Sequence, residues 1–232
     1  MQIPIFSLNK VEVKKENKNI LKINNFEIHR GAAYFIQGNM GVGKTTLLNL
    51  ITKNATPSSG SILYEDEDLL KMSKSKFLKD LACVDQSFRV PWGTVEKFIY
   101  KTLKKYPHIT NIDKKIADIS RKMEIKNLLD TKMSNLSPGQ LRWVELAANI
   151  AADSKVLIVD ELEQHLGAFH IKILNKILYR KCNFDGVTLI ATTQNKSFFQ
   201  SHLASVIITL EKGKIYSVRS SGKRKHQDRG KR

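Results

Sequence analysis

The chain has 232 residues, with 39 lysines and arginines against 22 aspartates and glutamates, for a formal net charge of +17 at pH 7. That length suits one sizeable core with an attached subdomain, and two distant cysteines exclude a disulfide framework and a zinc site. The sequence lacks a signal peptide pattern and a ~20-residue apolar run, so we expect a cytoplasmic protein. The positive charge would suit nucleic acid or an anionic membrane face, but a solvated lysine-rich surface explains it better, because no nucleic-acid-binding motif accompanies the charge.

The first half of the chain predicts short strands around a glycine-rich loop. Two strands, at 3–13 and 20–28, are expected on either side of a polar turn, and a buried strand at 32–36 precedes the loop. The pattern then predicts a helix at 47–51, a strand at 61–64, a solvated acidic loop at 65–68 and a strand at 81–84.

The second half predicts a helical insertion and then a return to the α/β core. Apolar residues recur at helical spacing from 94 to 152, and the apolar run at 155–159 is typical of a buried parallel strand. A helix at 169–179, a strand at 187–192, a short helix, and strands at 206–210 and 214–218 follow. Residues 219–232 form a basic tail without apolar periodicity, which we expect to be disordered and able to lie on anionic lipid.

The glycine-rich loop has the spacing G-x-x-x-x-G-K-T between a strand and a helix. Glycines let backbone N–H groups turn inward around a phosphate, and the positive end of the following helix adds attraction. Lysine reaches the β- and γ-phosphates, and the threonine hydroxyl ligates Mg²⁺. We therefore predict a nucleoside triphosphate site made by Gly38, Asn39, Met40, Gly41, Val42, Gly43, Lys44, Thr45 and Thr46.

Two further motifs carry polar groups suited to phosphate chemistry. The apolar strand at 156–159 ends in Asp160, which suits Mg²⁺, and Glu161, which suits a general base for the attacking water. Downstream of the loop, Leu136–Gln140 reads Leu-Ser-Pro-Gly-Gln. Ser137 is a predicted N-cap with Pro138 at the first helical position, and the same geometry makes an anion site.

Together these motifs resemble the ATP-binding subunit of an ABC (ATP-binding cassette) transporter over residues 1 to about 218. Gly38–Thr46 is similar to the Walker A motif, Val156–Glu161 to Walker B, and Leu136–Gln140 to the signature LSGGQ with proline replacing its first glycine. Gln86 is similar to the Q-loop glutamine. The resemblance implies an α/β P-loop NTPase (RecA-like) core with an antiparallel β subdomain and a helical subdomain at about 87–152.

The resemblance also implies cofactors, partners and residue roles. The cofactors are ATP and Mg²⁺, with Thr45, Gln86 and Asp160 at the metal and Glu161, Gln86 and Thr193 in catalysis. A head-to-tail homodimer would sandwich two ATP molecules, with Ser137 and Gly139 contacting nucleotide in trans. The partner would be a transmembrane permease-type subunit at the inner face of the cell membrane, docked near residues 88–98, where Trp92 is either a contact or packed.

Three positions depart from the family pattern. Lys15 stands where an aromatic ring normally stacks on adenine, and its aliphatic stem could serve instead. Thr193-Gln194 stands where the switch histidine is expected, and Gly167 replaces an aspartate. His165, nearby, is interpreted as a solvated residue at a helix start. These departures imply slow or partner-dependent hydrolysis.

Several functions remain open beside an energy-coupling ATPase. One is a hydrolysis-poor regulatory module of a cell-division (FtsE-like) complex; this type resembles the chain at 86–89 and 206–213, as do lipoprotein-release and macrolide-export ATPases. Another is a soluble ABC protein acting on nucleic acid or ribosomes, suggested by the basic charge. A GTPase is disfavoured, because Asn195-Lys196-Ser197 is followed by Phe198 rather than by aspartate.

Overall fold

The computed structural model describes residues 3–16, 18–86, 88–195, 198 and 201–220. In this part of the chain the strands are β1 (Phe6–Lys15), β2 (Lys18–Ile28), β3 (Ala33–Gln37), β4 (Ser59–Tyr64), β5 (Glu67–Asp68), β6 (Leu81–Val84), β7 (Val156–Val159), β8 (Thr188–Thr192), β9 (Val206–Glu211) and β10 (Lys214–Ser220). The α-helices are α1 (Lys44–Ile51), α2 (Lys74–Phe77), α3 (Val95–Leu103), α4 (Ile112–Lys122), α5 (Pro138–Ala151) and α6 (Ala168–Asn183), with short 3₁₀ helices at Lys126–Leu128 and Met133–Asn135.

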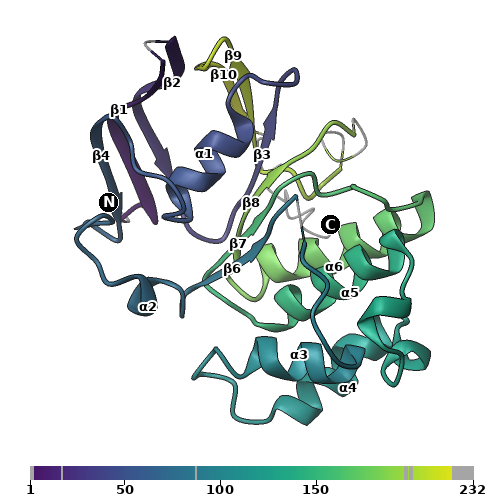
Figure 1. The fold of residues 1–232 in the computed structure, drawn as a ribbon. Coiled ribbons are helices and arrows are strands. Elements are labelled where there is room, and N and C mark those ends of the chain that lie inside the picture. The colour runs from purple at the N-terminus through teal and green to yellow at the C-terminus, as the bar shows by residue number, and fades with distance from the viewer. Residues whose placement is uncertain (1–2, 17, 87, 196–197, 199–200, 221–232) are drawn as a thin grey trace, which may run out of the picture.

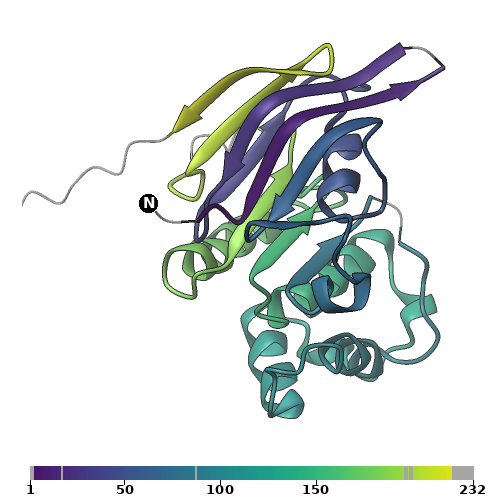
Figure 2. The same ribbon diagram turned by 90° about the vertical axis from the view of Figure 1, so that its left-hand side faces the viewer.

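The strands form two sheets, which Figures 1 and 2 show from two sides. One is antiparallel, with strand order β2-β1-β4-β5. The other has the order β10-β9-β3-β8-β7-β6, in which every neighbouring pair is parallel except β10 with β9. This mixed α/β architecture confirms the predicted fold class.

The parallel sheet is buried on both faces. Because successive side chains of a strand point to opposite faces, each strand supplies residues to two hydrophobic cores. In β3, Phe35 joins one hydrophobic core, and Tyr34 and Ile36 join the other. Strand β7 divides in the same way, with Leu157 in the first core and Ile158 in the second. The first core contains residues of α3, α4, α5 and α6, and the second contains residues of α1 and of the antiparallel sheet.

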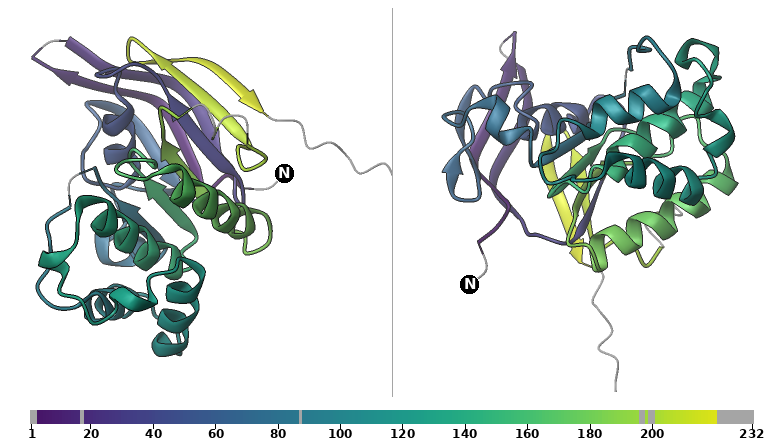
Figure 3. Two further views of the ribbon diagram at one scale, coloured as in Figure 1. Left: turned by 90° about the vertical axis from the view of Figure 1, so that its right-hand side faces the viewer. Right: turned by 90° about the horizontal axis from the view of Figure 1, so that it is seen from below.

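The region from 94 to 152 is helical and packs as one unit on the parallel sheet, as the two views of Figure 3 show. Helix α3 packs against α4 and α5. Trp143 of α5 is buried, and its indole Nε1 donates to the carbonyl of Met123 at 2.8 Å. Because this helical unit shares its core with β6 and β7, it is fixed directly to the strands that end at the candidate site.

Some elements differ from the sequence-based expectations. The acidic segment expected to be a solvated loop contributes β5, which pairs with β4, and α2 was not expected. Arg219 and Ser220, assigned to the disordered tail, extend β10, because β9 offers them Ile207 and Val206 as partners. The rest of the predicted tail, 221–232, and most of the short helix expected after 192 lie outside the described residues. No helix in the described part of the chain is long and apolar enough to cross a bilayer.

Candidate functional site

The glycine loop lies between the end of β3 and the start of α1, as the sequence predicts. Gly43 is the N-cap of α1 and has a φ of 101°, in the left-handed region that glycine tolerates best. Gly38 has no room for a side chain, because a Cβ there would lie 2.5 Å from the carbonyl oxygen of Leu210. Glycine is therefore required at position 43 because of its backbone angle, and at position 38 because β9 passes too close for a side chain.

Lys44 folds back over the loop that precedes it. Its ammonium Nζ donates to the carbonyl oxygens of Gly38, at 2.7 Å, and Asn39, at 2.9 Å. The lysine is nearly buried, and Met40 at the loop tip is almost fully exposed. A cation is thus held inside the ring of backbone that would surround a phosphate, with the N-terminus of α1 beneath it.

A carboxylate from β7 is held between two threonine hydroxyls. Thr45 Oγ1 donates to Asp160 Oδ2 at 2.7 Å, and Thr192 Oγ1 donates to Asp160 Oδ1 at 2.5 Å. Asp160 is 5% exposed, so these bonds replace water around a nearly buried anion. The contact joins the helix after the glycine loop to the ends of β7 and β8.

Thr45, Gln86 and Asp160 line one cavity of 260 Å³. Asp85 and Asn49 also line it, so its polar walls carry hydroxyl, amide and carboxylate oxygens. Oxygen donors suit Mg²⁺, which usually takes only one or two carboxylates from a protein and keeps other positions for water and phosphate. The three residues predicted to hold Mg²⁺ therefore fit that ion.

Glu161 follows Asp160 in a left-handed backbone conformation, with a φ of 49°. Its amide N–H donates to Thr192 Oγ1 at 2.7 Å, so the hydroxyl that binds Asp160 also fixes the next residue. Glu161 is half-buried, beside the carboxylate of the cavity. The predicted metal ligand and the predicted base are thus anchored by one side chain from β8.

The signature segment begins helix α5 with the predicted cap. Ser137 Oγ accepts from the Gln140 amide at 3.3 Å, and Gln140 Oε1 accepts from the Ser137 amide at 3.0 Å, which together make a capping box. Pro138 occupies the first helical position. The contact of Ser137 and Gly139 with nucleotide bound to a second copy stays a prediction.

The structure does not bring Thr193 to the cavity. Thr193 is 1% exposed, and its hydroxyl donates to Glu163 Oε2 at 2.5 Å. The other oxygen of Glu163 accepts from the amides of Gln194, at 2.6 Å, and Asn195, at 3.0 Å. Gln194 is the exposed member of the Thr193-Gln194 pair, so it is the residue that this loop presents at the surface.

The other departures from the family pattern lie where the chain is exposed. Lys15 is exposed at the end of β1, in the hairpin whose second strand passes Gly43; a Cβ on that glycine would lie 3.1 Å from the Ile20 carbonyl oxygen. Gly167 is exposed as the N-cap of α6. The nearby His165 is exposed in the turn before this helix, and its carbonyl oxygen lies 2.9 Å from a Cβ built on Gly139. A side chain at position 139 would clash with this turn, which explains why the signature segment has glycine there.

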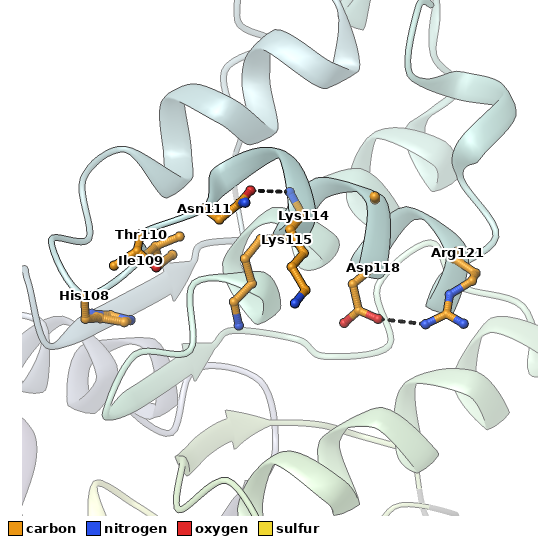
Figure 4. Close-up of a pocket in the computed structure, with 9 residues that line it drawn as sticks. His108, Ile109, Thr110, Asn111, Lys114, Lys115, Asp118 and Arg121 are labelled. Carbon is orange, nitrogen blue, oxygen red and sulfur yellow. Dashed lines mark hydrogen bonds and ion pairs between the residues drawn. The ribbon is translucent and has the colours of Figure 1, made fainter.

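A second cavity, of 670 Å³, lies along α4, away from the glycine loop (Figure 4). Its charged side chains are bound locally. Asp118 accepts from Arg121 and Lys122, and Lys115 pairs with Asp153. None of the predicted site residues lines this cavity, whereas Thr45, Gln86 and Asp160 line the smaller one.

Two site features were missed by the sequence analysis. Glu163 holds the loop that contains Thr193, and Arg142 donates to the backbone carbonyl groups of Asp160 and Glu161. Each contact joins residues at least 18 positions apart, and neither residue belongs to a motif position that identifies it. The pairing of β7 with β8 and the packing of α5 against the sheet bring these residues together.

Similar proteins share this architecture. A family model described as "ABC transporter" matches residues 21–163. A probable ABC transporter ATP-binding protein, p29, of Mesomycoplasma hyorhinis is 28% identical over 221 residues, covering 87% of this chain and 88% of that protein.

Two solved structures show the same fold. The first is cbiO1 from Clostridium perfringens, part of the transporter complex cbiONQ, with a TM-score of 0.79 and 22% identity over 94% of this chain and 89% of that one. The second is the ATP-binding cassette MJ0796, a dimer in a post-hydrolysis state with ADP and Pi, with a TM-score of 0.81 and 21% identity over 93% and 98%. The family match spans more than half of the 232 residues and contains both the glycine loop and the Asp160-Glu161 pair. The chain therefore belongs to the ABC transporter family, as an ATP-binding domain.

Proposed function

We propose that this chain binds and hydrolyses ATP as one of two copies that close head to tail around two nucleotides, and that this motion drives a transmembrane partner. The observation that carries the proposal is the single cavity lined by Thr45, Gln86 and Asp160 next to the glycine loop. Its oxygen donors support a Mg²⁺ ion bound beside the phosphates that Lys44 would hold. The dimer reported for MJ0796 supports the pairing.

In this proposal each residue has a distinct task. Lys44 exchanges its bonds to Gly38 and Asn39 for phosphate oxygens, and Thr45, Gln86 and Asp160 hold Mg²⁺, which neutralises charge on the phosphates. Glu161 takes the proton of the attacking water as general base. Ser137 and Gly139, at the N-terminus of α5, contact the nucleotide bound to the second copy, where helix N–H groups favour an anion.

The experiment is phosphate release from purified protein and its Glu161→Gln variant, with nucleotide binding measured in parallel. We expect steady-state turnover to be lost in the variant while ATP binding survives, because the amide keeps the shape of the side chain but accepts no proton. Turnover equal to that of the unaltered protein would refute Glu161 as the base. Thr45→Ser, which retains the hydroxyl, serves as the control.

A hydrolysis-poor regulatory module is the second candidate, favoured by the loop at Thr193. The hydroxyl there is bound to Glu163 rather than presented to the cavity, and the chain has no histidine at this place. Single-turnover phosphate release separates the two functions. A stable ATP-bound dimer that releases almost no phosphate over many minutes would favour the regulatory module.

The partner surface would lie between β6 and α3. Trp92 is 96% exposed and Val90 is half exposed, whereas Phe88 and Phe98 pack edge to face 5.5 Å apart. An exposed tryptophan fits contact with another protein better than internal packing. Pull-down from detergent-solubilised membranes should recover a multi-spanning protein, as expected for a subunit at the inner membrane face. Recovery of ribosomes or nucleic acid alone at high salt would instead support the soluble alternative.

A further inference from the structure

Arg142 is a buried cation of α5 that faces the ends of two neighbouring strands. β6 and β7 are parallel, and Val84 at the end of one pairs with Val159 at the end of the other. The guanidinium of Arg142 lies against the carbonyl groups that follow these ends and is 5% exposed. Burying a charged group costs free energy unless hydrogen bonds replace its water. The hydrogen-bond partners of this guanidinium therefore indicate its role.

Its partners are three backbone carbonyls from two segments. Arg142 Nη1 donates to the Asp85 carbonyl at 2.8 Å. Nη2 donates to the Asp160 carbonyl at 2.5 Å and to the Glu161 carbonyl at 3.1 Å. The planar fork of a guanidinium can serve several acceptors at once, which the single ammonium of lysine does less well. One side chain therefore binds Asp85, which precedes Gln86, together with the proposed metal ligand Asp160 and the proposed base Glu161.

Glu145, one turn along α5, supplies the opposite charge. Its Oε2 lies 3.1 Å from Arg142 Nη1, and the glutamate is 4% exposed. The pair is therefore buried as a unit, and the carboxylate holds the guanidinium from the helix side while the carbonyls hold it from the strand side. This arrangement leaves the fork little freedom to turn.

The backbone of Glu161 needs external support. A non-glycine residue with a φ of 49° is strained and persists only where surrounding contacts hold it. Two contacts do so, since the amide N–H donates to Thr192 Oγ1 at 2.7 Å and the carbonyl accepts from Arg142. One comes from β8 and the other from helix α5.

We propose that Arg142 is a positioning residue for hydrolysis, which fixes the backbone of Glu161 and of the segment before Gln86 relative to the helix that begins with Ser137. The proposal rests on the proposed role of Glu161 as the base. Arg142 touches neither nucleotide nor water in this scheme. Its removal leaves the glycine loop intact but frees the base and the metal-binding glutamine to move, and small displacements of reacting groups lower turnover strongly.

The test compares Arg142→Met with Arg121→Met, a matched substitution at an exposed arginine of α4 whose partner is Asp118. We expect Arg142→Met to lower kcat at least about tenfold with KM for ATP within about threefold, and the control to change neither. Arg142→Lys should recover part of the loss, because an ammonium can still donate to one or two of the carbonyls.

A second readout needs no hydrolysis. Backbone amide hydrogen exchange in peptides that contain Asp85-Gln86 and Asp160-Leu162 should be faster in Arg142→Met than in the unaltered protein, and unchanged in peptides of β1 and β2. If exchange is faster but even the unaltered protein releases no phosphate, Arg142 still fixes the backbone of Glu161 and of the segment before Gln86, and it is the proposed function, with Glu161 as the base, that fails. Unchanged exchange at these peptides, or unchanged kcat in a folded Arg142→Met protein, would overturn the proposal. Should that variant not fold, the same two measurements on Arg142→Lys decide.

Discussion

The hydroxyl of Thr45 donates a 2.7 Å hydrogen bond to Oδ2 of Asp160, a residue 115 positions away in the chain. This bond ties the helix after the glycine loop to the end of β7, at the cavity that also contains Gln86. A divalent cation placed there would accept both oxygens as ligands. The two residues of the proposed metal site are thus already in contact.

Thr45→Val should weaken the response to Mg²⁺. The substitution keeps the shape of the side chain but removes one oxygen ligand and one of the two donors to Asp160. We expect the Mg²⁺ concentration for half-maximal ATPase activity to rise about tenfold or more. Thr45→Ser keeps the hydroxyl and should respond as the unaltered protein does. Equal Mg²⁺ dependence of the valine variant would show that Thr45 is not a ligand.

Lys44→Ala should lose nucleotide binding as well as turnover. The ammonium is the only side-chain cation that donates to the carbonyls of the glycine loop among the described residues, so its removal takes away both the positive charge and the order of the loop. Binding of a fluorescent ATP analogue should weaken by at least about tenfold, as expected for a lost charge-assisted contact. Lys79→Ala, at an exposed lysine, is the control. Retained affinity in Lys44→Ala would contradict the phosphate-binding role.

Glu163→Ala should destabilise the loop after β8. The carboxylate accepts bonds from the hydroxyl of Thr193 and from the amides of Gln194 and Asn195, and the alanine leaves these donors without it. Losing a partner for half-buried donors costs about 1–3 kcal/mol. Urea denaturation should show this decrease in the free energy of unfolding, and Glu163→Gln, which keeps acceptor capacity, should lose less. No change in either variant would mean that solvent replaces the carboxylate.

Glu145→Gln should change how stability depends on pH. Burial raises the pKa of Glu145 to about 7, which the charge of Asp85 also favours and which Arg142 opposes. A carboxyl with a raised pKa binds more protons in the folded state than in the unfolded state. The contribution of Glu145 to the free energy of unfolding therefore falls as the pH rises from the unfolded pKa near 4.5, and it is fully lost above about 7. The Cys83 thiol also interacts with Glu145: burial raises the pKa of this thiol, and the nearby charge of Glu145 raises it further.

The measurement is urea denaturation of both proteins at pH 5.5 and pH 8. The glutamine variant does not ionise, so its free energy of unfolding relative to the unaltered protein should increase between the two pH values. A constant difference would show that Glu145 is ionised in the folded protein at both pH values, as it is in the unfolded chain.

The elements predicted well from the sequence are those whose cause is local. Strand, glycine loop and helix follow one another within 20 residues, and the capping box at Ser137 involves residues three positions apart. Neighbouring residues in the sequence determine backbone angles and caps of this kind. The family resemblance, carried by these motifs, is confirmed, although the subgroup suggested for cell division is not.

What the sequence missed depends on distant contacts. The pairing of β5 with β4 gives two acidic residues a strand that their composition does not favour. Arg142 reaches a carbonyl 57 positions away, and Glu163 reaches a loop 30 positions away. Thr193 was selected because a hydroxyl can bond to phosphate, but the choice between Thr193 and Gln194 depends on which side chain is buried, and only the fold decides that.

The two tryptophans of this chain lie in opposite surroundings. Trp143 is enclosed between α5 and α6, with its ring centroid 4.8 Å from that of His170, whereas Trp92 is surrounded by solvent. Their fluorescence should therefore differ in wavelength, with a blue-shifted emission from the first and a red-shifted, quencher-accessible emission from the second. The fluorescence of Trp143 should therefore report whether the helical region is folded. The fluorescence of Trp92 should report the binding of a partner at the surface near Gln86.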